Sequence, residues 1–301
     1  MKHVVDREIF IRLLVMVLGF GLITGFVYGV GKWLVPVVDS ADKAMVAACN
    51  PDAYVPVLDE FMRTSSDYTN FLIAAPLVSW MIAFGLLRLF PKSKPAIVRV
   101  LVFETIVMAA LAAVGEIWPN KTYVGANVFL VITVSVAFGA AAFLFHRMEM
   151  NSMIRFSRVF WLVLISVCLT DFIALNWLKV AVARPRPLNA ANKPWNEQLR
   201  VVPDEVLRGS DSFPSGHTSG TFSLLTPLFW YMSDRRVRVG MMGWAGLLGF
   251  SRVYTAAHFP FCCIMAGFLG FSVGTLVFFA LGNLFVSKSA DQDAAVIGSG
   301  C

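Results

Sequence analysis

Charged residues are scarce in this 301-residue chain: only 15% of its positions are Asp, Glu, Lys or Arg, whereas 57% are hydrophobic. Soluble domains average about 25% charged residues. A soluble fold of this length leaves roughly a quarter of its chain surface exposed, which is too much for so apolar a sequence. The composition therefore excludes an ordinary soluble enzyme and a disordered tail, and it predicts a polytopic membrane protein.

Cysteine and histidine are also sparse. The five cysteines show neither a disulfide framework nor the spacing of metal ligands, which excludes a disulfide-stapled secreted module. The four histidines are His3, His146, His217 and His258. Because no cluster of Asp, Glu or His suggests a metal site, we expect neither a metal nor a cofactor. The net charge of +6 would suggest nucleic acid in a soluble protein, but here we interpret it as a topology signal and expect no nucleic-acid partner.

Eight apolar runs approach the length needed to cross about 30 Å of hydrocarbon. They cover residues 9–33, 69–90, 96–118, 124–146, 159–179, 217–233, 239–254 and 258–285. Their hydrophobicity is continuous, which favours helices over the alternating strands of a membrane barrel. The predicted fold class is therefore all-α, a polytopic bundle of about eight transmembrane helices.

The distribution of Lys and Arg predicts the orientation of this bundle. Fourteen of the 25 basic residues fall at the termini or in loops on one side of the spans, which is typical of the cytoplasmic side. The opposite loop, residues 34–67, carries six acidic residues. We therefore expect both termini to lie in the cytoplasm, in a multi-pass protein of the bacterial inner membrane.

Seven cations fall on the outer side, where the same rule disfavours them. They are Lys179, Arg184, Arg186, Lys193, Arg200, Arg208 and Arg252. Binding of an anion is one reason to keep cations in that place. The alternative is that a long outer loop simply tolerates some bases.

Two of the outer segments that contain or adjoin these cations have the features of a phosphate site. Residues 213–218, Phe-Pro-Ser-Gly-His-Thr, are typical of a helix start, whose free N–H groups and partial positive charge suit a phosphate. The alternative is a plain capped turn. Residues 179–187 end the fifth span with Lys179 and Arg186, which are either phosphate ligands or anchors that reach the membrane interface.

The third segment, residues 251–258, joins the seventh and eighth spans and carries Arg252 and His258. The alternative for His258 is an interfacial histidine satisfied by a backbone carbonyl. With eight spans, all three segments meet at the outer face and supply cations, a helix N-terminus and two histidines. Phosphoryl transfer needs this set: cations and N–H groups stabilise the phosphate oxygens, one histidine attacks phosphorus, and another protonates the leaving oxygen.

The three segments resemble the signatures of the type 2 phosphatidic acid phosphatase superfamily, membrane lipid phosphate phosphatases related to vanadium haloperoxidases. The signatures are Lys, six residues, Arg-Pro; then Pro-Ser-Gly-His; then Ser-Arg, five residues, His, three residues, Asp. The chain matches the first over residues 179–187, the second over 214–217 and the third from Ser251 to His258. The resemblance covers about residues 96–285. It implies a six-helix phosphatase core in 96–287, which leaves two extra N-terminal helices with an acidic outer loop in residues 1–95. The small and polar residues 288–301 predict a disordered tail.

The resemblance also implies a role for each matching residue. His258 is then the nucleophile that forms a phosphohistidine, and His217 is the general acid. The implied phosphate-binding residues are Lys179, Arg186, Ser215, Gly216 through its amide, and Arg252.

One position departs from the family pattern. Cys262 stands where the family has the Asp that orients the nucleophilic imidazole, and a thiol is a weak acceptor. Either another acid takes over, or His258 is held less well, or activity is reduced. Asp171 and Asp211 are the candidate acids, although an interhelical hydrogen bond is the favoured interpretation of Asp171.

These observations predict an integral membrane phosphatase that hydrolyses a phosphate monoester or pyrophosphate of a lipid on the periplasmic face, without a metal. Its expected partners are the phosphorylated lipid and the bilayer, and the sequence carries no signal for oligomeric state. One alternative is a lipid phosphotransferase that uses the same site. A non-catalytic lipid-phosphate binder or transporter is the other, motivated by Cys262.

Overall fold

The computed structural model describes residues 2–117, 125–202 and 211–286, and every regular element in these ranges is helical. The predicted all-α fold class is therefore confirmed. The long helices are α1 (Lys2–Cys49), α2 (Pro56–Leu89), α3 (Lys94–Ile117), α4 (Gly125–Arg147), α5 (Met150–Val167), α6 (Asn176–Val182), α7 (Gly216–Tyr231), α8 (Arg235–Tyr254) and α9 (Pro260–Val286). Short helical segments are η1 (Pro91–Ser93), η2 (Cys168–Leu175), η3 (Ala190–Asn192) and η4 (Trp195–Gln198). The π-helical η2 joins α5 to α6 without a break.

Four stretches of helix within the described residues are long and apolar enough to cross a membrane. They are Arg7–Cys49, Lys94–Ala113, Val159–Val182 and Pro260–Gly282. Two shorter apolar stretches, Ile73–Leu87 and Val131–Arg147, lie in α2 and α4. These helices support a membrane protein, as the composition predicted.

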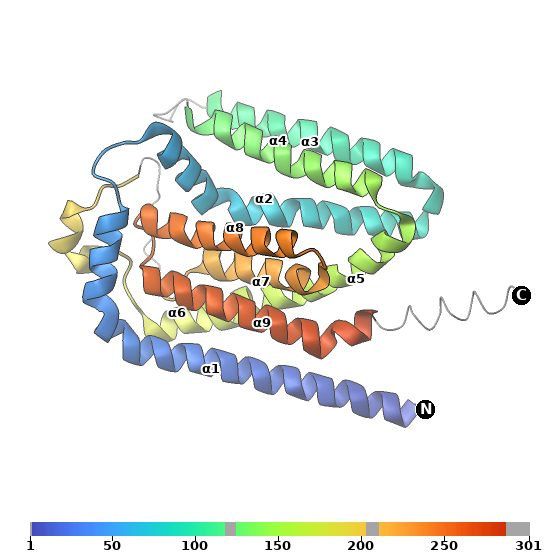
Figure 1. Ribbon diagram of the computed structural model, residues 1–301, viewed down its shortest axis with the longest axis horizontal. Helices are drawn as coiled ribbons and strands as arrows, with labels where there is room; N and C mark the ends of the chain where they lie inside the picture. The colour runs from blue at the N-terminus through green and yellow to red at the C-terminus, as the bar shows by residue number, and fades with distance from the viewer. Residues whose placement is uncertain (1, 118–124, 203–210, 287–301) are drawn as a thin grey trace, which may run out of the picture.

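Helix α7 occupies the centre of the bundle, in contact with α5, α8, α9 and α2 (Figure 1). Its middle part, residues 218–221 and 223–228, is buried although five of these residues are Ser or Thr. The hydroxyls of Thr221, Ser223 and Thr226 donate to carbonyl oxygens of the preceding turn, so the polar side chains are satisfied within the helix. Small residues also allow close packing: a Cβ atom on Gly270 of α9 would lie 2.3 Å from the carbonyl oxygen of Ser219.

The acidic segment 34–67, expected to form an outer loop, is helical over most of its length. Helix α1 contains Pro36 and continues to Cys49, and α2 begins at Pro56. Proline kinks a helix rather than ending it when the flanking turns are held by other contacts. Figure 1 shows the first part of α1 lying along α9 and its last part turning across the bundle.

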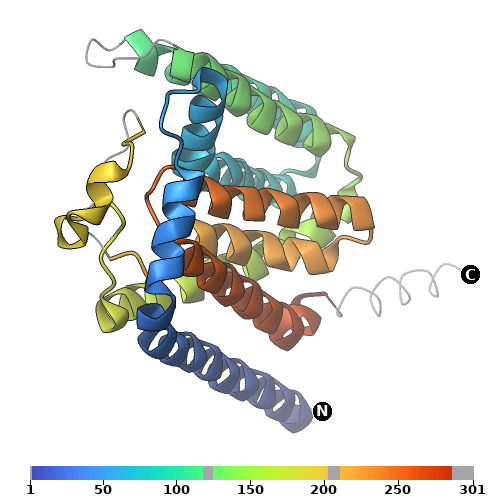
Figure 2. The ribbon, with the colours of Figure 1, turned by 60° about the vertical axis from the view of Figure 1, so that its left-hand side comes forward.

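The second part of α1 covers the end of the bundle where α6 ends, α7 begins, and α8 connects to α9 (Figure 2). Three hydrogen bonds fix it there. Asn50, just after α1, donates to the carbonyl oxygens of Arg200 and Tyr254, each at 3.0 Å. Asp42 accepts the N–H of Phe261 at 3.0 Å. The end of the bundle that carries the predicted motifs therefore lies beneath the N-terminal helix.

Candidate active site

Backbone hydrogen bonds join the three motif segments at this end of the bundle. The N–H of Ser212 donates to the carbonyl of Arg184 at 2.6 Å, which links the segment after α6 to the start of α7. The N–H of Ser215 donates to the carbonyl of Cys262 at 3.2 Å, which links the start of α7 to α9. The structure thus brings together the three segments that the sequence analysis selected.

His258 lies in the connection between α8 and α9, and only 1% of its surface is exposed. Its Nδ1 atom is 2.8 Å from the carbonyl oxygen of Ser212. Because a carbonyl oxygen can only accept, the proton is on Nδ1 and the lone pair is on Nε2. The hydrogen bond therefore selects the tautomer that an attacking imidazole needs.

Burial lowers the pKa of His258 well below its ordinary value of 6.5. The positive charges of Arg186, Arg252 and Lys179 lower this pKa further, while the hydrogen bond to Ser212 opposes the shift. The imidazole is therefore neutral at pH 7.

Arg252 is fully buried, and its Nη1 atom donates to the carbonyl oxygen of Ser66 at 3.2 Å and also to the Ser66 hydroxyl. Arg186 is 7% exposed and Lys179, in the last turn of α6, is half-buried. The positive charges thus come from two motif segments, 179–187 and 251–258, and Ser66 of α2 binds one of them, Arg252.

The Pro-Ser-Gly-His motif forms the start of α7, as predicted. Ser215 is the residue before the first helical turn, and its buried hydroxyl accepts a hydrogen bond from Thr218 at 3.0 Å. Gly216 begins the helix and His217 follows it, half-buried. The free N–H groups of this helix start lie in the same end of the bundle as His258.

Ser212, rather than Asp171 or Asp211, bonds Nδ1 of His258, and the interhelical hydrogen bond favoured for Asp171 is present. The Nδ1 proton goes to the Ser212 carbonyl, and Asp171 instead accepts from the Ser219 hydroxyl at 3.4 Å, an interhelical contact. Cys262 is buried and accepts from the Ser212 hydroxyl at 3.4 Å. The sequence analysis missed Ser212 because a backbone carbonyl leaves no side-chain signal.

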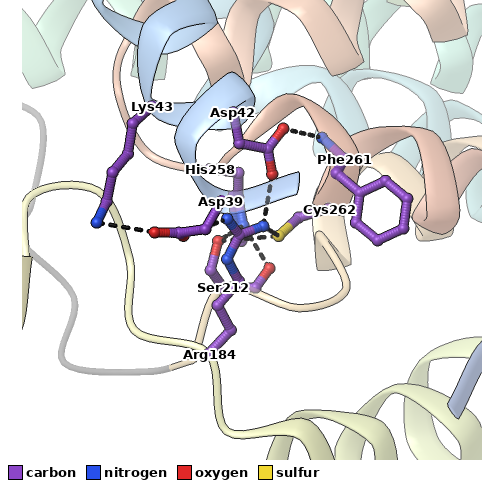
Figure 3. Close-up of polar contacts among 8 residues, drawn as sticks. All are labelled: Asp39, Asp42, Lys43, Arg184, Ser212, His258, Phe261 and Cys262. Carbon is purple, nitrogen blue, oxygen red and sulfur yellow. Dashed lines mark hydrogen bonds and ion pairs between the residues drawn. The ribbon is translucent and has the colours of Figure 1, made fainter. Parts of the chain in front are cut away.

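Arg184, in the motif segment 179–187, is the centre of an ion-pair network close to His258 and Cys262 (Figure 3). Its Nη1 donates to Asp42 at 2.6 Å and its Nη2 to Asp39 at 2.9 Å, both from α1. Nη1 also lies 3.4 Å from the sulfur of Cys262. The guanidinium stacks 3.9 Å above the Phe259 ring. This network was not predicted, although the acidic residues of segment 34–67 and the outer cations were its signal.

Several of the outer cations have acidic partners within the protein. Arg184 pairs with two acids, Arg200 pairs with Asp59 at 2.7 Å, and Lys193 lies 3.6 Å from Glu197. Arg208 lies outside the described residues. Lys179, Arg186 and Arg252 are the ones that act on His258.

An apolar cavity of about 470 Å³ adjoins the site between α7, α8 and α9. Thr218, Pro260 and Cys263 line it beside the motif segments, and Gly267, Phe268 and Phe271 line it farther along α9. Thr218 belongs both to the cavity wall and to the hydrogen bond with Ser215. Within the described residues, no group of three or more His, Cys, Asp or Glu could hold a metal ion.

Comparison with known proteins identifies the family of this segment. Residues 158–285 match the family model of the PAP2 superfamily, and this range contains all three motifs. No curated protein and no solved structure gave a significant match. Similarity to this superfamily supports a phosphatase-type function. Residues 158–285 of this chain therefore resemble the PAP2 superfamily, in agreement with the motifs they contain.

Proposed function

We propose that this protein is a membrane lipid phosphatase that hydrolyses a phosphate monoester or pyrophosphate of a lipid. The observation that carries the proposal is the state of His258: buried, neutral, bonded through Nδ1–H to Ser212, and surrounded by the charges of Lys179, Arg186 and Arg252. A neutral nucleophile beside three cations suits attack on an anionic phosphorus centre.

The reaction proceeds in two steps. Nε2 of His258 attacks phosphorus, the bond from phosphorus to the leaving oxygen breaks, and His217 gives its proton to that oxygen. Water then attacks the phosphohistidine, His217 takes a proton from that water, and the P–N bond breaks to release phosphate. Lys179, Arg186, Arg252, Ser215 and the Gly216 amide hold the phosphate oxygens through both steps.

The apolar cavity supports a lipid as the substrate. It begins at Thr218, next to the phosphate-binding hydroxyl of Ser215, and follows α9 along a helix apolar enough to cross a membrane. A hydrocarbon chain lying there has its head group at the motif segments. We propose that this cavity holds part of the lipid tail.

The proposed setting is the bacterial inner membrane. The excess of Lys and Arg on one side of the helices supports cytoplasmic termini and a periplasmic active site. We propose residues 1–95 as an N-terminal unit of two membrane helices and 96–287 as the six-helix phosphatase core. The predicted disordered tail, 288–301, lies outside the described residues.

Release of inorganic phosphate from a panel of phosphorylated lipids by purified protein tests this function. We expect activity on at least one lipid, its loss in His258→Ala, and its retention in His146→Ala, which removes an exposed histidine at the end of α4. Wild-type protein no more active than His258→Ala would overturn the proposal.

Cys262 motivates a second candidate, a non-catalytic lipid-phosphate binder, because the family's orienting acid is absent. Lipid binding without phosphate release would favour it. A radiolabelled lipid phosphate also distinguishes hydrolysis from transfer: label on an acceptor lipid rather than in solution would identify a phosphotransferase.

A further inference from the structure

The N-terminal helix α1, which lies outside the PAP2 segment, contributes a carboxylate to the region behind the nucleophile. Asp42 is 4% exposed. One of its oxygens accepts from Arg184 at 2.6 Å, and the other accepts from the N–H of Phe261 at 3.0 Å (Figure 3). One side chain therefore ties the segment after α6 to the first turn of α9.

A continuous set of contacts leads from this carboxylate to the imidazole. Arg184, 4% exposed, binds Asp42 through its guanidinium and accepts the Ser212 N–H through its carbonyl. The Ser212 carbonyl in turn accepts the Nδ1 proton of His258. A movement of Arg184 would displace the group that orients the nucleophile.

Position 262 lies against the same network. The Cys262 sulfur is 3.4 Å from Arg184 Nη1 and 3.4 Å from the Ser212 hydroxyl. A carboxylate at this position would pair with Arg184 from α9. In this chain the carboxylates that pair with Arg184 come from α1, as Asp42 and Asp39.

We propose that Asp42, assisted by Asp39, is a positioning residue for His258 that acts through Arg184 and Ser212. The α1 carboxylates then compensate for the thiol at position 262. Without them, a buried guanidinium loses its counter-charge, and both Arg184 and Ser212 relax from their present places. The proposal rests on the proposed function, since it concerns the nucleophile of that reaction.

The test is the rate of phosphohistidine formation, measured by rapid quench with a radiolabelled lipid phosphate, together with steady-state kcat and KM. Asp42→Asn should lower the rate and kcat on the order of 10–100-fold and leave KM within about twofold, because misaimed nucleophiles lose rate rather than binding. Asp39 is more exposed, so Asp39→Asn should give a smaller loss in the same direction. The matched control is Asp52→Asn, which changes an exposed carboxyl between α1 and α2 and should have no effect.

Rescue separates positioning from general damage. Adding Cys262→Asp to Asp42→Asn returns a carboxylate to Arg184 and should recover most of the lost rate. Adding Cys262→Asn supplies the same shape without charge and should recover none. Equal rates in the two double variants, or Asp42→Asn within twofold of wild type, would overturn the inference.

The outcomes also separate this inference from the proposed function. If wild-type protein forms a phosphohistidine and Asp42→Asn forms it equally fast, only the positioning role is wrong. If wild-type protein forms none with any lipid, the phosphatase proposal fails and the positioning role fails with it. Should Asp42→Asn fold poorly, the loss in Asp39→Asn decides the question, because that variant retains the buried Asp42–Arg184 pair.

Discussion

Replacing Asp59 with Ala should destabilise the protein strongly. Asp59 is 1% exposed, and three donors point at its carboxylate: Arg200 at 2.7 Å, the Tyr254 hydroxyl at 2.8 Å and the Val55 N–H at 3.0 Å. Tyr254 is only 4% exposed, so its hydroxyl loses its acceptor in a buried place. Arg200 is partly exposed and can be hydrated.

The expected loss follows from these contacts. A buried donor left unsatisfied costs about 1–3 kcal/mol, and removing one partner of a buried ion pair costs about 3–5 kcal/mol. Because Arg200 retains some hydration, we expect the lower part of that range, about 3–4 kcal/mol in the free energy of unfolding. This corresponds to a fall in Tm of roughly 5–10 °C for a chain of this size.

Thermal unfolding in detergent, followed by tryptophan fluorescence, measures this difference. The control is Asp52→Ala, which removes an exposed carboxyl from the same segment and should change Tm by less than about 2 °C. Equal Tm values for the two variants would refute the claim that the outer acids and cations are structural partners.

Three further predictions concern the reaction. Because the pKa of His258 is lowered, its imidazole stays neutral as the pH falls, so phosphohistidine formation should not slow between about pH 7.5 and pH 6. A histidine with a pKa of about 6.5 would lose about three-quarters of its neutral form by pH 6. A fall of that size in the rate, measured with a substrate that does not titrate in this range, would contradict the assignment. Treatment with EDTA should leave phosphate release unchanged, and abolished release would show that a metal is required. Gly246 lines the apolar cavity, and a Cβ atom there would meet nothing within 4 Å, so the ring of Gly246→Phe should block the cavity. We expect kcat/KM to fall about tenfold for a long-chain lipid and to stay unchanged for a water-soluble phosphate ester. Equal losses on both substrates would argue against a lipid tail in this cavity.

Local sequence information was enough to predict the helices and the motif segments. Continuous apolar runs determine where helices form, because backbone groups in hydrocarbon must be satisfied within the chain. The start of α7 at Gly216 also followed from Pro, Ser and Gly ahead of an apolar run. Both the apolar runs and the start of α7 depend on residues that are close together in the sequence, so one sequence is enough to predict them.

The ion pairs could not be predicted because they join distant parts of the chain. Asp42 and Arg184 are 142 residues apart, and only the path of α1 past Pro36 brings them together. The first apolar run ends at residue 33, yet α1 continues to Cys49 because the tertiary contacts of Asp42 and Asn50 hold the following turns. The Ser212 carbonyl was hidden for a different reason, since every residue has one.

The most direct test of this account is the identification of a covalent phosphoryl group on His258. Purified protein mixed with a radiolabelled lipid phosphate should carry an acid-labile label, and mass spectrometry should map it to the peptide containing His258. His258→Ala should carry no label, and His146→Ala should carry as much as wild type. Equal label in wild type and His258→Ala, or phosphate release from wild type without any label, would contradict the account.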